Sequence, residues 1–243
     1  MKKNKIFIAC DTSNINLVKT IINQTNTNKL EIIPKFGLQF FYSKQGRRFL
    51  EKFNNNFFLD LKINDIKQTA LSAIDSLKDL KKCKYITVHA NGGLEMLKAV
   101  KKKAAKTNKN LKILGVTVLT SLNNKSLKEI GHTKTLDQLV LKQAGLIKKA
   151  GLHGAVLSAK EAKIVKNYCS KGILFFSFAG DKDLAGECVY LINFFPEDDL
   201  IALFNHFPID SKVALLYPEN FYGYQINKII DPIALKSQSL IIN

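Results

Sequence analysis

The chain has 243 residues, and 46% of them are hydrophobic. This length and apolar content predict a globular protein with a full core and exclude an intrinsically disordered chain. No apolar run reaches about 18 residues, and no cleavage site follows the opening Met-Lys-Lys-Asn-Lys, so we expect a soluble, cytoplasmic protein with no membrane partner. The four cysteines are scattered and have no histidine at metal spacing, so neither disulfides nor a metal site is predicted.

The formal net charge of +17 would favour nucleic-acid binding if the basic side chains were clustered. They are spread along the chain, and 37 − 2 = 35 of them are lysines, because the only arginines are Arg47 and Arg48. One dense basic helix is expected between Lys98 and Lys109, but no aromatic stacking motif accompanies it. The distribution of charge therefore argues against nucleic acid as a partner.

Short apolar runs alternate with amphipathic stretches along the whole chain, which is typical of a parallel sheet covered by helices. The three-to-four spacing of the apolar residues predicts the helices, and the continuous runs predict the strands. The predicted strands are 6–11, 30–35, 56–62, 85–89, 113–117, 154–157 and 172–176. The predicted helices are 16–24, 39–54, 66–80, 93–105, 126–129 with 136–150, and 159–168.

An eighth strand is expected at 212–217, after a helix that Pro196 would start, and residues 188–194 compete for the same place. Eight strand–helix units in a chain of this length predict an α/β fold of the (β/α)8 TIM barrel type. We expect residues 1–243 to form one such barrel domain.

Three charged residues follow the apolar run Phe57–Leu59, where a buried strand should end. In a strand Asp60 and Lys62 point to the same face, while Asp65 lies in the turn beyond. A lysine held between carboxylates stays protonated and can donate a proton, and a buried carboxylate can repel a second anion beside it. The alternative is a solvated strand end with a chance ion pair.

Several other predicted strands also end in polar residues, namely Asp11-Thr12, Lys35, His89 and Thr120-Ser121. Because the carboxyl ends of the strands converge on one mouth of a barrel, these residues favour a binding or catalytic site over a chance ion pair at a solvated strand end. We expect His89 to orient loops rather than to act as a base. Gly92-Gly93 is expected to serve a strand-to-helix turn with positive φ.

These segments resemble the orotidine 5'-monophosphate decarboxylase family, in the family's order, over the first two thirds of the chain. Lys35 discriminates within the wider group, because related sugar-phosphate decarboxylases and aldolases place a magnesium-binding glutamate at that strand end. The matching segments are Ala9–Thr12, Lys35–Gly37, Phe58–Lys62 with Asp65, Ile66 and Thr69, Val88–Gly93, Val116–Ser121, and Gly154–Ala159 before Glu161.

The resemblance implies a carboxy-lyase that converts orotidine 5'-monophosphate (OMP) to UMP and carbon dioxide in de novo pyrimidine biosynthesis, with no cofactor. In this interpretation Lys62 is the proton donor to C6 of the pyrimidine, and Asp60 lies against the substrate carboxylate. Lys35 and Asp65 complete an alternating charged array with them.

The resemblance also implies the binding residues and the assembly. Asp11 and Lys35 would hold the ribose hydroxyls, and Thr120 would hold the pyrimidine ring. Asp65 and Thr69 would reach into the neighbouring subunit's site. We therefore expect a homodimer with shared active sites.

The chain departs from the family from about residue 173. Family members hold the phosphate with Thr-Pro-Gly-Ile-Arg and Gly-Arg-Pro segments, whereas this chain has no arginine after Arg48. Lysine supplies the charge but not the bidentate fork of arginine, so weak affinity and reduced turnover are predicted, with Lys182 and Lys212 as substitutes. Two alternatives stay open: a catalytically impaired or inactive homologue that binds a nucleotide or a protein partner, and a sequence artefact in the final part of the chain.

Overall fold

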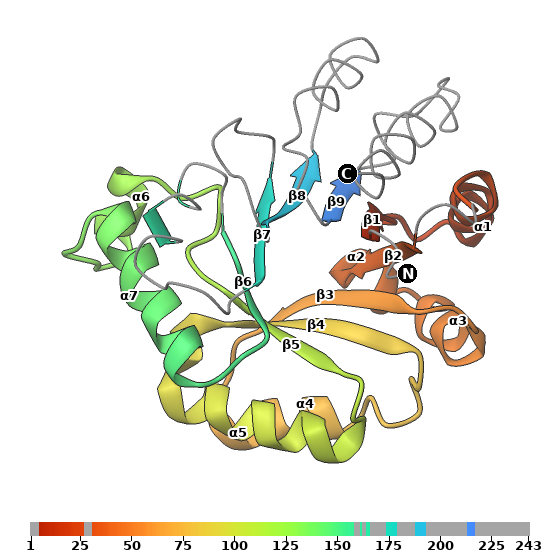
Figure 1. The fold of residues 1–243 in the computed structure, drawn as a ribbon, viewed down its shortest axis with the longest axis horizontal. Helices are drawn as coiled ribbons and strands as arrows, with labels where there is room; N and C mark the ends of the chain where they lie inside the picture. Colours follow the sequence, from red (N-terminus) through yellow and green to blue (C-terminus); the bar gives the residue numbers. More distant parts are fainter. Residues whose placement is uncertain are drawn as a thin grey trace, which may run out of the picture. The chain divides into compact units, whose positions relative to one another are not determined.

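The computed structural model describes residues 5–26, 31–157, 161, 164–165, 174–178, 188–192 and 213–216. The chain divides into two compact units, one made of Met1–Phe58 with Phe178–Asn243 and the other of Leu59–Ser177. Each unit contains parallel strands and flanking helices (Figure 1). The chain is therefore an α/β protein, as predicted. Within the described residues, no helix is long and apolar enough to cross a membrane.

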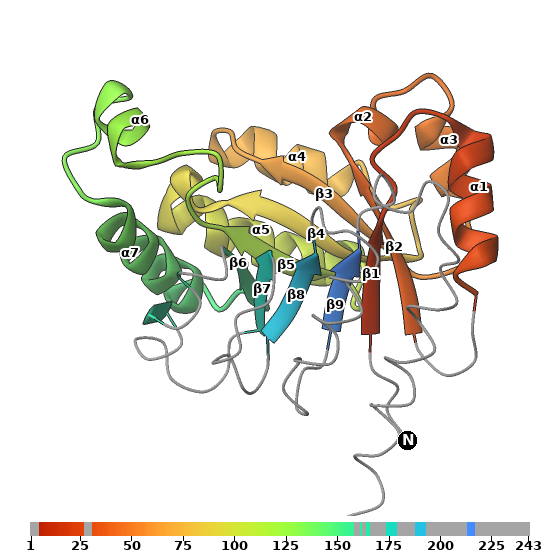
Figure 2. The same ribbon diagram turned by 90° about the horizontal axis from the view of Figure 1, so that it is seen from above.

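The sheet of the first unit has the order β2-β1-β9-β8, and all of its strands are parallel (Figure 2). β1 aligns with β2 so that Ala9 lies opposite Lys35. The strands are β1 (Lys5–Ala9), β2 (Glu31–Gly37), β8 (Cys188–Ile192) and β9 (Val213–Leu216).

The expectation that residues 188–194 and 212–217 compete for one strand was wrong, because both segments form strands. β9 pairs with β1 on one side and with β8 on the other. Both segments are short apolar runs, and apolar side chains on both faces suit a strand that is flanked on both edges by parallel neighbours. Local pattern therefore could not choose between them.

The helices of the first unit begin and end at local signals. α1 (Ile15–Gln24) starts after Asn14, whose side chain accepts hydrogen bonds from the backbone N–H groups of Asn16 and Leu17. The predicted helix 39–54 is instead two helices, α2 (Leu38–Phe41) and α3 (Gly46–Lys52). The break follows from Ser43, whose hydroxyl donates to the Phe40 carbonyl and accepts the Gly46 N–H.

Five phenylalanines pack α2 and α3 against the strands of the first unit. The ring centroids of Phe36 and Phe40 lie 4.5 Å apart in a stacked pair, and those of Phe49 and Phe53 lie 5.4 Å apart. Phe36 also meets Phe57 edge-on at 6.0 Å. Each such pair contributes about 0.5–1.5 kcal/mol beyond area burial. This cluster fixes the end of β2, and with it the backbone that carries Lys35.

The strands of the second unit are also parallel and run in the order β4-β5-β6-β7. β3 contacts β4 through hydrogen bonds to Thr87, and Leu59 onward belongs to this unit. The strands are β3 (Phe57–Ile63), β4 (Cys83–His89), β5 (Lys112–Val116), β6 (Gly154–Val156) and β7 (Leu174–Phe178).

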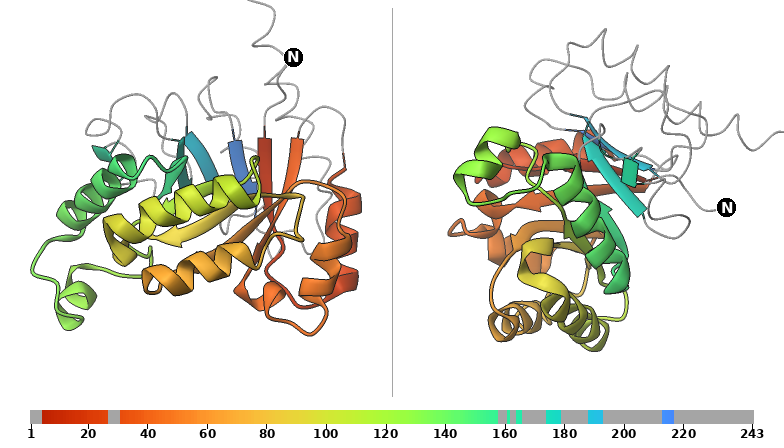
Figure 3. Two further views of the ribbon diagram at one scale, coloured as in Figure 1. Left: turned by 90° about the horizontal axis from the view of Figure 1, so that it is seen from below. Right: turned by 90° about the vertical axis from the view of Figure 1, so that its left-hand side faces the viewer.

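The helices of the second unit cover this sheet, and α4 lies beside α5 in both views (Figures 1 and 3). They are α4 (Lys67–Asp75), the 3-10 turn η1 (Ala90–Gly92), α5 (Gly93–Thr107), α6 (Asn124–Glu129) and α7 (Leu136–Lys149). The predicted helix at 159–168 falls mostly outside the described residues, which include helical Glu161, Ile164 and Val165.

Local sequence determines where two helices of the second unit, α7 and α5, begin. Thr135 and Gln138 form a capping box at the start of α7, each side chain accepting the backbone N–H of the other. Gly93 has a φ of 79°, which confirms the predicted positive-φ turn after β4, whereas Gly92 has a φ of −65°. A side chain at position 93 would be strained in this left-handed region.

Candidate active site

The Asp60–Lys62 pair lies at the carboxyl end of β3, as the sequence predicted. Lys62 Nζ donates to Asp60 Oδ2 at 2.7 Å. Asp60 is 9% exposed, whereas the Lys62 side chain is about one third exposed, at 35%. The carboxylate is therefore anchored in the protein, and the ammonium group reaches from it toward solvent. A buried carboxylate with an adjacent ammonium group is a local dipole that can act on a charged ligand.

Thr87 of β4 ties this pair together, and the sequence analysis did not identify it. Its hydroxyl donates to Asp60 Oδ1 at 2.8 Å and accepts the backbone N–H of Lys62 at 2.8 Å. Thr87 is fully buried. The signal that could have found it is a hydroxyl two residues before His89, and so on the same face of the strand.

Lys62 has an unusual backbone conformation. Its φ is 48°, and among the described residues it is the one non-glycine position with positive φ. Such a conformation costs of order 1–3 kcal/mol and persists where surrounding contacts hold it, often at functional sites. Here both the amide and the ammonium group of Lys62 are held by hydrogen bonds.

A second series of hydrogen bonds connects the end of β4 to α7. His89 Nδ1 accepts the backbone N–H of Asn91, and Asn91 Oδ1 accepts from Gln143 Nε2 at 2.7 Å. Burial lowers the pKa of His89, and the Lys62 charge lowers it further. The imidazole is therefore neutral near pH 7, with Nδ1 as the acceptor. These contacts support the expectation that His89 orients the loop after β4 instead of acting as a base.

The first unit contains a separate ion pair at the ends of β1 and β2. Lys35 Nζ lies 2.5 Å from Asp11 Oδ2, and Lys35 is 3% exposed. Gly37 makes room for this carboxylate, because a Cβ at position 37 would collide with Asp11 Oδ1. Asp11 Oδ1 is buried and has no hydrogen-bond partner among the described residues. It is thus an acceptor that a ligand hydroxyl could satisfy.

The other predicted site residues lie on exposed segments of the second unit. Asp65 is exposed in the loop between β3 and α4, where its Oδ1 accepts the N–H of Ile66. Thr69 is exposed in the first turn of α4, and Thr120 is exposed in the turn after β5. The structure thus pairs Lys62 with Asp60 and Lys35 with Asp11, while the four-residue charged array stays a prediction.

The predicted phosphate contacts are not described by the structure, because Lys182 and Lys212 lie outside the described residues. Within the described part of the chain, no group of three His, Cys, Asp or Glu side chains could hold a metal ion.

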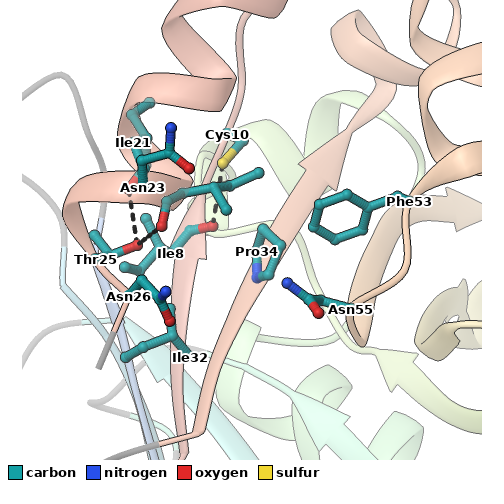
Figure 4. Close-up of a pocket in the computed structure, with 11 residues that line it drawn as sticks. Ile8, Cys10, Ile21, Asn23, Thr25, Asn26, Ile32, Pro34, Phe53 and Asn55 are labelled. Carbon is teal, nitrogen blue, oxygen red and sulfur yellow. Dashed lines mark hydrogen bonds between the residues drawn. The ribbon is translucent and has the colours of Figure 1, made fainter. Parts of the chain in front are cut away.

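A small cavity of about 130 Å³ also lies in the first unit (Figure 4). Its lining includes Ile8 of β1 and Cys10, which directly follows β1, with Ile32 and Pro34 of β2. Because side chains alternate along a strand, these residues point away from the face that carries Asp11 and Lys35. Burial raises the pKa of the Cys10 thiol, so the thiol is not an activated nucleophile. The cavity is lined by other residues than Asp11 and Lys35.

Parallel strands with charged side chains at their carboxyl ends define an α/β protein with a lysine–carboxylate site. The family model described as "Orotidine 5'-phosphate decarboxylase / HUMPS family" matches residues 4–179. The chain belongs to this family, as the sequence resemblance predicted.

Named relatives and solved structures agree with this assignment. Orotidine 5'-phosphate decarboxylase of Wolbachia sp. subsp. Brugia malayi (strain TRS) is 38% identical over 170 residues, which cover 69% of this chain and 73% of that protein. The Ehrlichia chaffeensis (strain Arkansas) enzyme of the same name is 32% identical over 229 residues, covering 88% of this chain and 92% of its own length. The crystal structure of orotidine 5'-phosphate decarboxylase from Lactobacillus acidophilus shares the fold, with a TM-score of 0.73, 21% identity, and coverage of 95% of this chain and 99% of that one.

Proposed function

We propose that this protein decarboxylates OMP to UMP and carbon dioxide. The observation that carries the proposal is the Asp60–Lys62 pair, in which a buried carboxylate and a proton donor lie 2.7 Å apart at a strand end. The names of the relatives support OMP as the substrate. The protein is then a carboxy-lyase of pyrimidine biosynthesis.

In the proposed reaction the substrate carboxylate lies against Asp60, and the repulsion between the two anions is relieved as carbon dioxide leaves. The bond between C6 and the carboxylate breaks, and its electron pair stays on C6. Lys62 Nζ then donates a proton to C6, which gives UMP and leaves a neutral amine that regains a proton from solvent. The charges of the pair are held in place before the reaction, so little reorganisation accompanies it.

The remaining predicted residues fit a ribose and ring subsite in this proposal. Asp11 and Lys35 would bind the ribose hydroxyls, and Asp11 Oδ1, which has no hydrogen-bond partner in the described part of the chain, is suited to accept a hydrogen bond from one of them. Thr120 would contact the pyrimidine, and its exposure in the turn after β5 leaves the hydroxyl accessible. Lys35 would also join Lys62, Asp60 and Asp65 in one charged array.

We further propose that the chain forms one (β/α)8 barrel domain and assembles as a cytoplasmic homodimer. The fold shared with the Lactobacillus acidophilus structure supports the barrel. The exposure of Asp65 and Thr69 supports the dimer, because side chains that complete a partner's site must face outward in the single chain. Ile66, between them, is 73% exposed, which is unfavourable for an isoleucine unless another surface covers it.

Phosphate binding is the weak part of the proposed site. No arginine follows Arg48, so lysine must supply the positive charge, and Lys182 and Lys212 are the candidates. This loss favours the second candidate function, an impaired or inactive homologue that binds a nucleotide or a protein partner. Against a sequence artefact, the Ehrlichia chaffeensis match covers 88% of the chain and so extends past the end of the family match at residue 179.

The test is release of carbon dioxide from carboxyl-labelled OMP by the full chain. We expect Lys62→Ala to lower kcat by about 10²- to 10⁴-fold, the usual contribution of a general acid. Lys109→Ala, an exposed lysine after α5, is the matched control and should retain activity. Release of carbon dioxide separates the two candidates, and calorimetry with UMP tests whether a protein that releases none still binds a nucleotide. A wild-type protein that binds UMP without releasing carbon dioxide would establish the inactive homologue.

A further inference from the structure

Thr87 completes a closed ring of hydrogen bonds with Asp60 and Lys62. The Lys62 N–H donates to Thr87 Oγ1, the Thr87 hydroxyl donates to Asp60 Oδ1, and Lys62 Nζ donates to Asp60 Oδ2. Thr87 is fully buried, so water does not compete for its hydroxyl. The ring joins β3 to β4 at the position where the proposed reaction occurs.

The direction of each hydrogen bond in the ring is fixed by chemistry. The Lys62 amide can only donate, so Thr87 Oγ1 must accept from it. The hydroxyl proton of Thr87 is then free to point to the carboxylate, which can only accept when ionised. Each oxygen of Asp60 is therefore held by a different donor. A carboxylate held at one oxygen alone could rotate, whereas this one is fixed in both position and plane.

The same hydroxyl holds the backbone of the proton donor. Lys62 has the left-handed φ of 48°, which is unfavourable for a lysine. Its amide finds its hydrogen-bond acceptor in the Thr87 side chain. Thr87 therefore acts at both ends of the pair, on the carboxylate of Asp60 and on the backbone that aims Lys62.

We propose that Thr87 is a positioning residue that fixes the relative orientation of Asp60 and Lys62 for the decarboxylation step. This inference rests on the proposed function and adds a residue from β4 to it. The competing explanation is that threonine only fills the strand, since β-branched residues suit buried strands. Valine has nearly the same shape as threonine and lacks the hydroxyl, so the two explanations make opposite predictions.

Thr87→Val and Thr87→Ser in the full chain separate these explanations. We expect Thr87→Val to lower kcat by about 10- to 100-fold with little change in KM, because misplacement of reacting groups costs rates of this size. Thr87→Ser keeps the hydroxyl and should restore kcat to near the wild-type value. If Thr87 only fills space, valine is neutral and serine, which leaves a methyl-sized gap, is the more damaging change.

A matched control removes another buried hydroxyl of the same unit. Thr117 is also fully buried, and its hydroxyl donates to the Val156 carbonyl. Thr117→Val should therefore leave the ratio of kcat to KM close to wild type. A loss of kcat in Thr117→Val as large as that in Thr87→Val would contradict a specific role for Thr87.

Hydrogen exchange of the Lys62 amide tests the ring without any assay of activity. The amide should be protected in the wild type and in Thr87→Ser, and should exchange about tenfold faster or more in Thr87→Val, which removes its acceptor. If the wild type fails to decarboxylate OMP while this pattern holds, the proposed function is wrong and the ring is real. Wild-type kcat in Thr87→Val, or unchanged exchange at Lys62, would overturn the inference.

Discussion

His153 links the pH of the solution to the stability of the second unit. Its Nδ1 accepts the backbone N–H of Ile113 at 2.9 Å, and its Nε2 lies 2.6 Å from Lys101 Nζ. Burial, together with the charges of Lys101 and Lys112, lowers the pKa of His153 from 6.5 to about 4. Burial also lowers the pKa of Lys101. A protonated His153 would lose its acceptor at Nδ1 and place two cations side by side.

The sign of the effect follows from proton binding. Between pH 6.5 and pH 4 the unfolded chain protonates His153 and the folded chain does not, so acid favours unfolding. The stability contribution is complete above pH 6.5 and is lost as the pH falls through 4. A shift of 6.5 − 4 = 2.5 pKa units corresponds to about 3.4 kcal/mol. Because the side chain is only half-buried, solvent screening reduces this to about 1–2 kcal/mol.

The assay is urea unfolding at pH 7 and pH 4.5, for the wild type and His153→Asn. The asparagine Oδ1 can accept the Ile113 N–H but does not titrate. Between pH 7 and pH 4.5 we expect the unfolding free energy of the wild type to fall by about 1–2 kcal/mol more than that of His153→Asn. His132→Asn, at a partly exposed histidine, controls for loss of an imidazole and should follow the wild type. Equal losses in the wild type and His153→Asn would refute the reasoning.

Three further predictions concern other positions. Gly115→Ala would place a Cβ 2.6 Å from Ile147 Cδ1, so we expect urea unfolding to show an unfolding free energy lower by about 1–3 kcal/mol. The double variant with Ile147→Ala should lose less unfolding free energy than the sum of the two single changes. Thr135→Ala removes the cap of α7 and should lower the unfolding free energy by about 0.5–2 kcal/mol, whereas Thr135→Ser should not. Gly37→Ala would push the Asp11 carboxylate away from Lys35. Calorimetry should therefore find that UMP binds about tenfold more weakly, which is about 1.4 kcal/mol of binding free energy. Unchanged UMP binding would argue against a ribose contact at Asp11.

The sequence by itself determined the class of fold and the positions of most elements. The helices 16–24 and 136–150 were predicted to within about a residue, because a side-chain cap and three-to-four apolar spacing are properties of neighbouring residues. Asp60 and Lys62 were placed on one face by the period of a strand, and the structure pairs them. The predicted roles of these residues in catalysis stay predictions.

Only the tertiary structure decided which distant groups meet. Thr87 reaches Asp60 across 27 residues of sequence, and His153 reaches Lys101 across 52. Strand pairing also made strands of both candidate segments near the end of the chain. Periodicity reports which face a residue occupies, but the alignment of neighbouring elements decides what lies opposite it. The chain therefore encodes the charged pair locally, whereas the hydroxyl that orients the pair comes from another strand and is known only from the fold.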